Sequence, residues 1–284
     1  MSTSPYPWAP GFHPGDRPQI VTSRFQYDDA HTIERFEATG GYRGLRAALG
    51  KTPEAMAEEV KNSTLLGRGG AGFPAGVKWG FTPQGVWPRY LVVNGDESEP
   101  GTYKDRLLME CDPHQLIEGC LIAAYAAGLS QCSLYIRGEM PLAHERGAAA
   151  LDEAYAAGYV GRNILGTNFS VDIILHTGAG AYVVGEETAL IESLEGERGM
   201  PRLKPPYFPA AVGLYGQPTI VNNVETLANL PFIAREGSAA YTAVGTPTSP
   251  GTRMIAVSGH VRRPGVYEIV NGSTTFRELL YGDD

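Results

Sequence analysis

The sequence has few cysteines and no long apolar run. Only three cysteines occur in 284 residues, Cys111, Cys120 and Cys132, and none are spaced as C-x-x-C. This argues against a disulfide framework, a zinc site or an iron–sulfur cluster held by this chain, and favours a reducing compartment. The most apolar stretch, residues 116–129, is too short to span a membrane and carries Glu118. The N-terminus lacks the basic and then apolar pattern of a secretory signal.

Blocks of like charge are also absent. The chain has 23 basic and 31 acidic residues and a net charge of -8. Their even mixing argues against binding to nucleic acid or to an anionic membrane. There is neither a P-loop nor a G-x-S-x-G elbow. No two of the six histidines have metal-ligand spacing on one element, so we expect no metal site.

Strand-like and helix-like segments alternate in the middle of the chain. Strands are predicted at residues 89–95, 132–139 and 171–178, and helices at residues 113–128, 141–158 and 185–196. This alternation predicts parallel strands joined by right-handed crossovers, an α/β fold with a Rossmann-like parallel sheet. Ligands of such sheets bind beyond the carboxyl ends of the strands. The polar segments 94–105 and 176–187 follow the first and third strands.

Three units are expected along the chain. Residues 1–31 begin Pro-rich and polar, which predicts an extended arm. Residues 32–250 form the α/β domain, which opens with three short helices. Residues 251–284 predict two alternating strands and then a helix capped by Thr274 or Thr275. That order is the opening of a β-grasp unit of the SLBB type.

A glycine-rich segment contains the pattern G-x-G-x-x-G at Gly67, Gly69 and Gly72. A helix-like segment rather than a strand precedes it, so an ordinary dinucleotide-binding fingerprint is not expected. The loop is either a tight connection that needs positive φ, or a cradle in which backbone N–H groups approach an anion. Arg68 and Lys78 add positive charge beside it.

Aromatic residues follow this loop closely. Phe73, Trp79 and Phe81 either belong to the core or offer faces on which an adenine stacks. A second aromatic loop, Lys204–Phe208, is stiffened by two prolines.

Two acidic segments and an asparagine pair have alternative interpretations. Asp96, Glu97 and Glu99 form either a solvated turn or acceptors for ribose hydroxyls and the polar NH groups of a flavin; Glu99 could also contact a nicotinamide amide. Glu186 and Glu187 either complement a helix dipole or include an acceptor for both ribose hydroxyls, which would repel a 2′-phosphate and select NAD(H) over NADP(H).

The asparagine pair opens a predicted helix. Asn222, Asn223 and Thr226 are either helix caps or ligands of a phosphate or a ribityl chain at the helix N-terminus.

Four segments together resemble one family. GRGGAGFPAGVKW, NGDESEPGTYKDR, GAGAYVVGEETALIESLEG and VNNVETLANLP are similar, in this order, to the FMN-binding, NADH-oxidising F subunit of respiratory complex I and its relatives. The resemblance runs from about Thr32 to the end. It implies hydride transfer from NADH to FMN, as the electron-input subunit of NADH:quinone oxidoreductase. The alternatives are a diaphorase subunit of an NAD-linked hydrogenase or formate dehydrogenase, or a non-catalytic fragment of such a subunit.

The resemblance also implies roles for individual residues. Glu99 is expected to position the nicotinamide, as the one catalytic residue. The expected FMN and NAD(H) contacts are Gly67, Arg68, Gly69, Gly70, Ala71, Gly72, Phe73, Gly76, Lys78, Phe81, Asn94, Asp96, Glu97, Ser98, Gly180, Tyr182, Gly185, Glu186, Glu187, Lys204, Tyr207, Phe208, Asn222, Asn223 and Thr226. The aromatic loop is one residue longer than the family pattern, so either Tyr207 or Phe208 faces the adenine.

Partners are implied in the same way. They are NADH, a thioredoxin-like iron–sulfur subunit and a large iron–sulfur subunit, which would hold this chain at the cytoplasmic face of the inner membrane without inserting it. Full-length relatives also carry an iron–sulfur cluster in a C-terminal helical bundle. No cysteine follows Cys132, so ligands for that cluster are not expected here.

Overall fold

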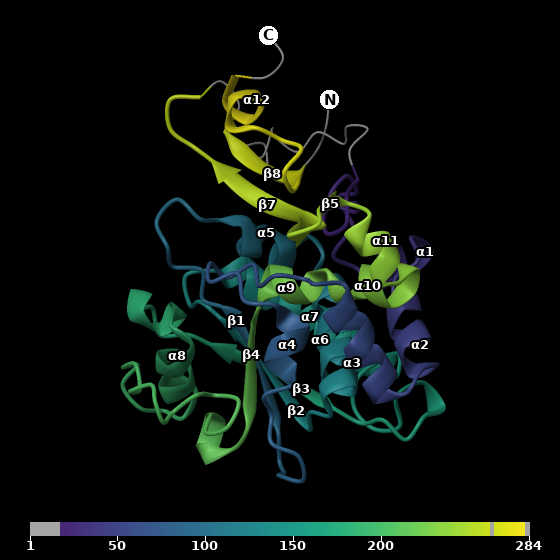
Figure 1. The fold of residues 1–284 in the computed structure, drawn as a ribbon, viewed down its shortest axis with the longest axis vertical. Helices are drawn as coiled ribbons and strands as arrows, with labels where there is room; N and C mark the ends of the chain where they lie inside the picture. Colours follow the sequence, from purple (N-terminus) through teal and green to yellow (C-terminus); the bar gives the residue numbers. More distant parts are fainter. Residues whose placement is uncertain (1–17, 262–263, 282–284) are drawn as a thin grey trace.

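A four-stranded parallel sheet forms the centre of the protein (Figure 1). The computed structural model describes residues 18–261 and 264–281, so residues 1–17 of the expected arm lie outside it. The strands are β1 (Tyr90–Gly95), β2 (Gln131–Ile136), β3 (Asp172–Thr177) and β4 (Thr219–Asn223), in the order β3-β2-β1-β4. The predicted α/β fold with a parallel sheet is confirmed.

Both faces of the sheet are covered by apolar layers. Leu91 and Val93 of β1 belong to the main core, whereas Val92 packs with Tyr135 and Val221 in a second cluster beneath α8 (Glu187–Leu194). Figure 1 shows α8 on one side of β1 and β4, and α3, α4 and α6 on the other. Burial on both faces explains why β1 contains a continuous apolar run, whereas the edge strand β3 has alternate residues exposed.

Helix α6 (Pro113–Ala127) forms the middle of the main core. The Asp112 side chain accepts a hydrogen bond from Gln115 N, and Gly128 ends the helix with a φ of 63°. Gly119 allows α9 (Val224–Ala228) to approach, because a Cβ at this position would lie 2.2 Å from Leu227 O.

The remaining elements surround this core. The described helices are α1 (Ile33–Ala38), α2 (Arg43–Leu49), α3 (Pro53–Asn62), α4 (Ala75–Trp79), α5 (Lys104–Cys111), α7 (Pro141–Ala156), α10 (Leu230–Glu236), α11 (Ser238–Thr242) and α12 (Phe276–Tyr281), with short 3-10 turns at Ile164–Gly166, Tyr182–Gly185 and Leu214–Gly216. Two short strands, β5 (Gly245–Thr246) and β6 (Ser249–Pro250), pair before the last hairpin. None of the described helices is long and apolar enough to cross a membrane.

The elements that the sequence does not predict include α4, α5, α11 and the strands β4, β5 and β6. Strand β4 has only five residues and ends in the two asparagines that resemble a helix cap. Strand β4 pairs with β1, while β3 lies at the far edge of the sheet. The segment after β3 nevertheless returns to the end of β1, since Asn94 Nδ2 donates to Gly185 O at 2.9 Å.

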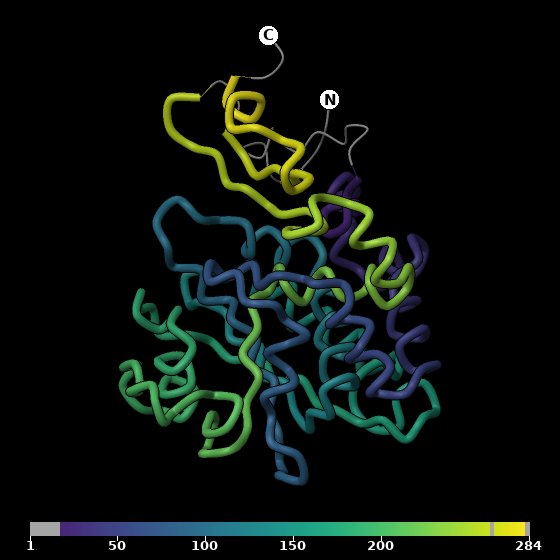
Figure 2. Tube along the Cα trace, viewed as in Figure 1, coloured from purple at the N-terminus to yellow at the C-terminus, as the bar shows by residue number. Residues whose placement is uncertain are grey.

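An antiparallel hairpin, β7 (Thr252–Val257) and β8 (Gly265–Val270), precedes α12. The Thr275 hydroxyl accepts a hydrogen bond from Glu278 N, as expected for a cap at this point. Glu268 of β8 accepts hydrogen bonds from Ile20 N at 2.8 Å and Thr22 N at 3.0 Å. Figure 2 shows the first described residues beside the base of this hairpin.

Candidate nucleotide-binding site

A cavity of about 790 Å³ opens at the carboxyl ends of β1 and β4. The chain runs from β1 to β2 and β3 on one side and reaches β4 on the other, so the cavity lies where the strand order reverses. Its volume falls within the range of about 300–1,000 Å³ that is usual for small-molecule and cofactor sites. It is lined by Gly67, Gly69, Ala71, Gly72, Phe73, Lys78, Phe81, Asn94, Gly185, Glu186, Glu187, Lys204, Phe208, Pro209, Ala210, Ala211, Val221, Asn222, Asn223 and Thr226.

The glycine loop forms one wall of the cavity. Gly67 N donates to Phe73 O at 2.9 Å and closes the loop. Gly70 has a φ of 113° and Gly72 a φ of 67°, and a Cβ on either would meet no atom within 4 Å. The loop therefore needs glycine at both positions for its backbone conformation, and Gly72, which lines the cavity, leaves open space there.

Arg68 points away from this cavity. Its guanidinium donates to Thr252 O at 2.8 Å and to Tyr241 Oη at 3.2 Å, so it fastens the glycine loop to the strand that begins the hairpin. Gly76 is likewise needed for packing, since a Cβ there would lie 2.5 Å from Lys61 Cα. The side-chain cation that the glycine-loop region supplies to the cavity is Lys78.

Two lysines and two glutamates, here called the lysine–glutamate cluster, meet at the N-terminus of α8. Glu187 is bound by Lys78 Nζ at 2.8 Å and by Lys204 Nζ at 2.9 Å. Glu186 binds Lys204 Nζ at 2.8 Å. Partial burial opposes ionisation of Glu187, but the two lysines outweigh it and lower the pKa of this carboxyl. The cluster therefore holds two positive and two negative charges.

The two glutamates of the cluster differ in their other contacts. Glu186 is the N-cap of α8, because one carboxylate oxygen accepts from Thr188 N at 2.8 Å and from Ala189 N at 3.0 Å. Both glutamates line the cavity, but no backbone N–H of the described helix α8 binds Glu187. The Glu187 carboxylate is thus held by the two lysine side chains and not by the helix backbone.

The acidic loop after β1 does not line the large cavity, but part of it touches the lining. A Cβ on Gly185 would lie 3.4 Å from Asp96 Oδ2 and 3.6 Å from Ser98 Oγ. Glu97 instead accepts hydrogen bonds from the backbone N–H groups at the start of α5, at 2.7–2.8 Å. Burial, together with the nearby Asp105, raises the pKa of Glu97 to about 7.

Glu99 lies farther out, where its carboxylate accepts a hydrogen bond from the exposed Tyr182 hydroxyl. The expected residues outside the lining of the large cavity are Arg68, Gly70, Gly76, Asp96, Glu97, Ser98, Glu99, Gly180, Tyr182 and Tyr207.

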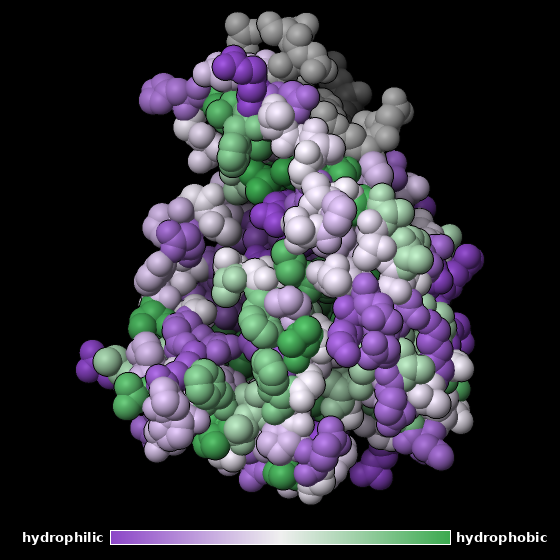
Figure 3. Space-filling model, viewed as in Figure 1, coloured by the Kyte–Doolittle hydropathy of each residue, from purple (hydrophilic) through white to green (hydrophobic). Residues whose placement is uncertain are grey.

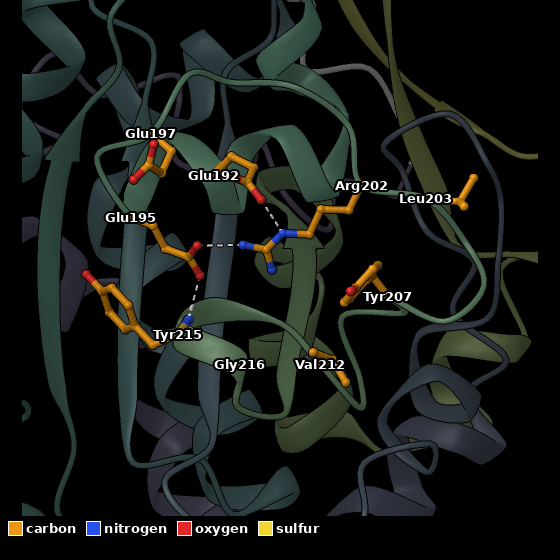
Figure 4. A pocket seen from close by; sticks show the side chains of 9 residues that line it. All are labelled: Glu192, Glu195, Glu197, Arg202, Leu203, Tyr207, Val212, Tyr215 and Gly216. Atoms are coloured by element: carbon orange, nitrogen blue, oxygen red, sulfur yellow. Dashed lines mark hydrogen bonds and ion pairs between the residues drawn. The ribbon is translucent and has the colours of Figure 1, made fainter.

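The two rings of the second aromatic loop face different cavities. Phe208 lines the large cavity. Tyr207 lines a second cavity of about 570 Å³, where Arg202 lies between Glu192 and Glu195 (Figure 4). Arg202 also donates to Gly213 O at 3.0 Å, so it connects the C-terminal end of α8 to the segment before β4.

Three phenylalanine rings stand at the cavity with large exposed fractions: 46% for Phe73, 58% for Phe81 and 52% for Phe208. Figure 3 shows hydrophobic surface in the middle of the molecule, over the region of α4 and β4. Sequence reasoning misses Pro209, Ala210, Ala211 and Val221 of the lining. They carry no polar signal, and only their position next to predicted residues points to them.

Known proteins are similar to this chain in sequence. The family model of the Nuo51 FMN-binding domain, Complex1_51K, matches residues 60–232. A NADH-quinone oxidoreductase F subunit of Rhizobium meliloti, the second of that name, is 54% identical over 263 residues, which are 92% of this chain and 62% of that protein. The NADH-quinone oxidoreductase F subunit of Aquifex aeolicus is 49% identical over 276 residues, 97% of this chain and 64% of that protein.

A solved structure is similar as well. The crystal structure of an NAD+-reducing NiFe-hydrogenase in the air-oxidised state has a TM-score of 0.73 and 42% identity, over 81% of this chain and 38% of that chain. The present chain spans less than two thirds of the length of the F-subunit relatives that it matches. The family match covers the glycine loop, the ends of β1 and β4 and the lysine–glutamate cluster. The chain belongs to the family of the Nuo51 FMN-binding domain.

Proposed function

We propose that this chain binds FMN and oxidises NADH, as the electron-input subunit of an NADH:quinone oxidoreductase. The observation that carries the proposal is the cavity at the reversal of strand order, walled by the glycine loop on one side and by exposed rings and the lysine–glutamate cluster on the other. Relatives that are 49–54% identical are named as the F subunit of that enzyme.

The residues present suit a flavin mononucleotide. A phosphate and a flavin carbonyl both need hydrogen-bond donors, and the glycine loop offers backbone N–H groups without a Cβ to block the approach at Gly70 and Gly72. Asn222 and Thr226 add side-chain donors on the opposite wall. Asn94 is held at the end of β1 by a bond from its Nδ2 to Gly185 O at 2.9 Å.

The other half of the cavity suits the nicotinamide nucleotide. Phe73 and Phe81 have ring centroids 5.9 Å apart and are tilted by 46°, and with Phe208 they offer faces for an adenine. The placement of Phe208 supports it rather than Tyr207 in that role. Glu187 would accept the adenosine ribose hydroxyls, and Glu99 with Tyr182 would orient the nicotinamide amide at the outer edge.

When bound, FMN supplies the acceptor for the hydride of NADH. The protein's contribution is to bind and orient the two flat groups and to exclude water. No side chain has to give or take a proton during the transfer. Asp96, Glu97 and Ser98 act indirectly in this scheme, by shaping the loop between β1 and α5.

The wider setting is also part of the proposal. A thioredoxin-like iron–sulfur subunit and a large iron–sulfur subunit would receive the electrons and hold the chain at the cytoplasmic face of the inner membrane. A diaphorase subunit of an NAD-linked hydrogenase is the second candidate, since the solved structure with 42% identity is such an enzyme. The higher identity to the quinone-linked relatives favours the first candidate.

The experiment is to purify the 284-residue chain, release any pigment by heat and identify it by chromatography. We expect the released pigment to be FMN. We also expect the chain to oxidise NADH faster with ferricyanide than with quinone as the acceptor, because ferricyanide accepts electrons from flavin directly. FAD in the supernatant would refute the flavin assignment. A folded chain that binds neither flavin would favour a non-catalytic fragment.

A further inference from the structure

Two neighbouring asparagines at the end of β4 are held by partners of opposite hydrogen-bonding character. Asn222 Oδ1 accepts from Trp79 Nε1 at 3.0 Å. An indole N–H can only donate, so the carbonyl oxygen of Asn222 must face Trp79 and its NH2 group must turn away. Asn222 lines the cavity, and no atom in the described part of the chain accepts a hydrogen bond from its Nδ2.

Asn223 is fixed by the reverse arrangement. Its Nδ2 donates to Asp105 Oδ2 at 2.6 Å, and its Oδ1 accepts from Glu225 N at 3.0 Å. An ionised carboxylate can only accept, so turning the amide over would bring two acceptors together. The other oxygen of this carboxyl group, Asp105 Oδ1, lies 2.8 Å from Lys104 Nζ.

Lys104 is itself secured on both sides. Its Nζ also lies 2.7 Å from Glu225 Oε2. Burial favours the neutral amine, but Asp105 and Glu225 outweigh it and raise the pKa of Lys104. The charges that orient Asn223 are therefore buried and fixed, while Asn223 itself reaches the cavity.

Thr226 repeats the pattern on the next turn. Its Oγ1 accepts from Arg68 N at 2.9 Å, which leaves the hydroxyl hydrogen for another acceptor. Trp79, Asp105 and Arg68 do not line the cavity. Trp79 and Arg68 each donate to the oxygen of a neighbouring side chain and so leave its hydrogens for another acceptor, whereas Asp105 accepts one N–H of Asn223.

We propose that Trp79 is a positioning residue that fixes the amide of Asn222, so that its N–H groups rather than its carbonyl oxygen face the acceptor atoms of the cofactor. We propose likewise that Asp105 fixes the amide of Asn223 by accepting one of its N–H groups. This inference rests on the proposed FMN site. It makes the β4 wall selective for the acceptor-rich part of the ligand, its phosphate and carbonyl groups.

The first test needs no cofactor. The chain has three tryptophans and hence three indole N–H signals in an NMR spectrum. The signals of Trp79 and Trp87 are assigned by their disappearance in Trp79→Phe and Trp87→Phe. In the apo-protein, Asn222→Ala should move the Trp79 signal upfield and speed its exchange with water, and should leave the exposed Trp87 signal unchanged. An unmoved Trp79 signal would overturn the inference.

The second test is a double-mutant cycle on FMN affinity, followed by flavin fluorescence. In the wild-type background, Trp79→Phe should raise the Kd for FMN about 3- to 10-fold, which corresponds to the loss of one hydrogen bond. In the Asn222→Ala background the same substitution should change the Kd by no more than about twofold, because the hydrogen bond is already absent. An equal effect in both backgrounds would mean that Trp79 acts by packing alone, which overturns the proposal. Trp87→Phe is the matched control. If the wild-type chain binds no FMN, the proposed function fails, while the indole signals still decide the Trp79–Asn222 contact.

The same cycle applies to the second pair, Asp105→Asn against Asn223→Ala. Asp105→Asn weakens the ion pair of the buried Lys104 and can therefore lower stability, so the thermal unfolding of the apo-protein is measured as well. If this variant does not fold, the Trp79 cycle still tests the proposal.

Discussion

Replacing Glu187 with alanine should move the nucleotide preference toward NADPH. In the wild-type protein Glu187 is bound by both Lys78 and Lys204, at 2.8 and 2.9 Å. A 2′-phosphate near the adenosine ribose would meet this carboxylate and would have to compete with it for both lysines. The alanine variant removes the competitor, so Lys78 loses its carboxylate partner and Lys204 keeps Glu186 alone.

The size of the effect follows from the charges of the lysine–glutamate cluster. Removing Glu187 changes the net charge of the lysine–glutamate cluster from zero to +1. One unit charge about 5 Å from a phosphate charge contributes about 3 kcal/mol at an effective dielectric constant of 20. The Glu187 side chain is 28% exposed, so solvent screening reduces this to about 1–2 kcal/mol. The ratio of kcat/KM for NADPH to that for NADH should therefore rise about 5- to 30-fold.

The assay measures both kcat/KM values in the wild type and in two variants, at low and high salt. Glu186→Ala is the matched control, since this residue is the N-cap of α8 and its loss should lower stability by about 1 kcal/mol and weaken flavin retention, without changing the ratio. If Glu186→Ala shifts the ratio and Glu187→Ala does not, the two roles are reversed. If neither variant shifts it, NADH does not bind at this cluster.

Three further predictions concern metal content, pH and packing. Iron analysis and low-temperature paramagnetic resonance after reduction should find no iron–sulfur cluster in this chain; near-stoichiometric iron with a cluster signal would contradict the ligand assignment. Burial raises the pKa of Glu118 from 4.5 to about 7. Because the folded state binds this proton more tightly than the unfolded state, the free energy of unfolding should fall as the pH rises from 4.5 to about 7. Urea unfolding at several pH values should show that the free energy of unfolding depends less on pH in Glu118→Gln than in the wild type. Gly119→Ala should lower the free energy of unfolding by about 1–3 kcal/mol, because its Cβ would lie 2.2 Å from Leu227 O. Gly147→Ala is the control, since its Cβ would meet only side chains, at 3.7 Å or more. In the same experiment this variant should be neutral or stabilised by about 0.5–1 kcal/mol.

The parallel sheet can be predicted from the sequence because its strands are apolar runs at regular spacing and its longer helices carry local start and stop signals. Strand β4 cannot, since five residues that end in Asn222 and Asn223 give no alternation and look like a helix cap. Its strand character comes from pairing with β1, a partner more than 120 residues earlier in the sequence.

Part of the candidate site can also be predicted from local sequence. Glycines, lysines and rings that line the cavity stand out as unusual local sequence. The contacts of Arg68 and Glu97 do not, because each depends on a distant or irregular partner: Arg68 reaches Thr252, and Glu97 accepts N–H groups seven to nine residues along the chain. A charged residue beside a glycine loop thus gives no indication of which way its side chain points.

The contact between Glu268 and the backbone at Ile20 and Thr22 determines when the chain can complete its fold during synthesis. The partners are 246 to 248 residues apart. At about 5–20 residues per second, the carboxylate is made roughly 12–50 s after the backbone groups that it binds. During that interval these N–H groups can bond only to water or to a transient partner. The N–H groups of Ile20 and Thr22 therefore gain their carboxylate partner only after the four strands of the sheet have been synthesised, whereas Ile20 O can bind Gln115 earlier.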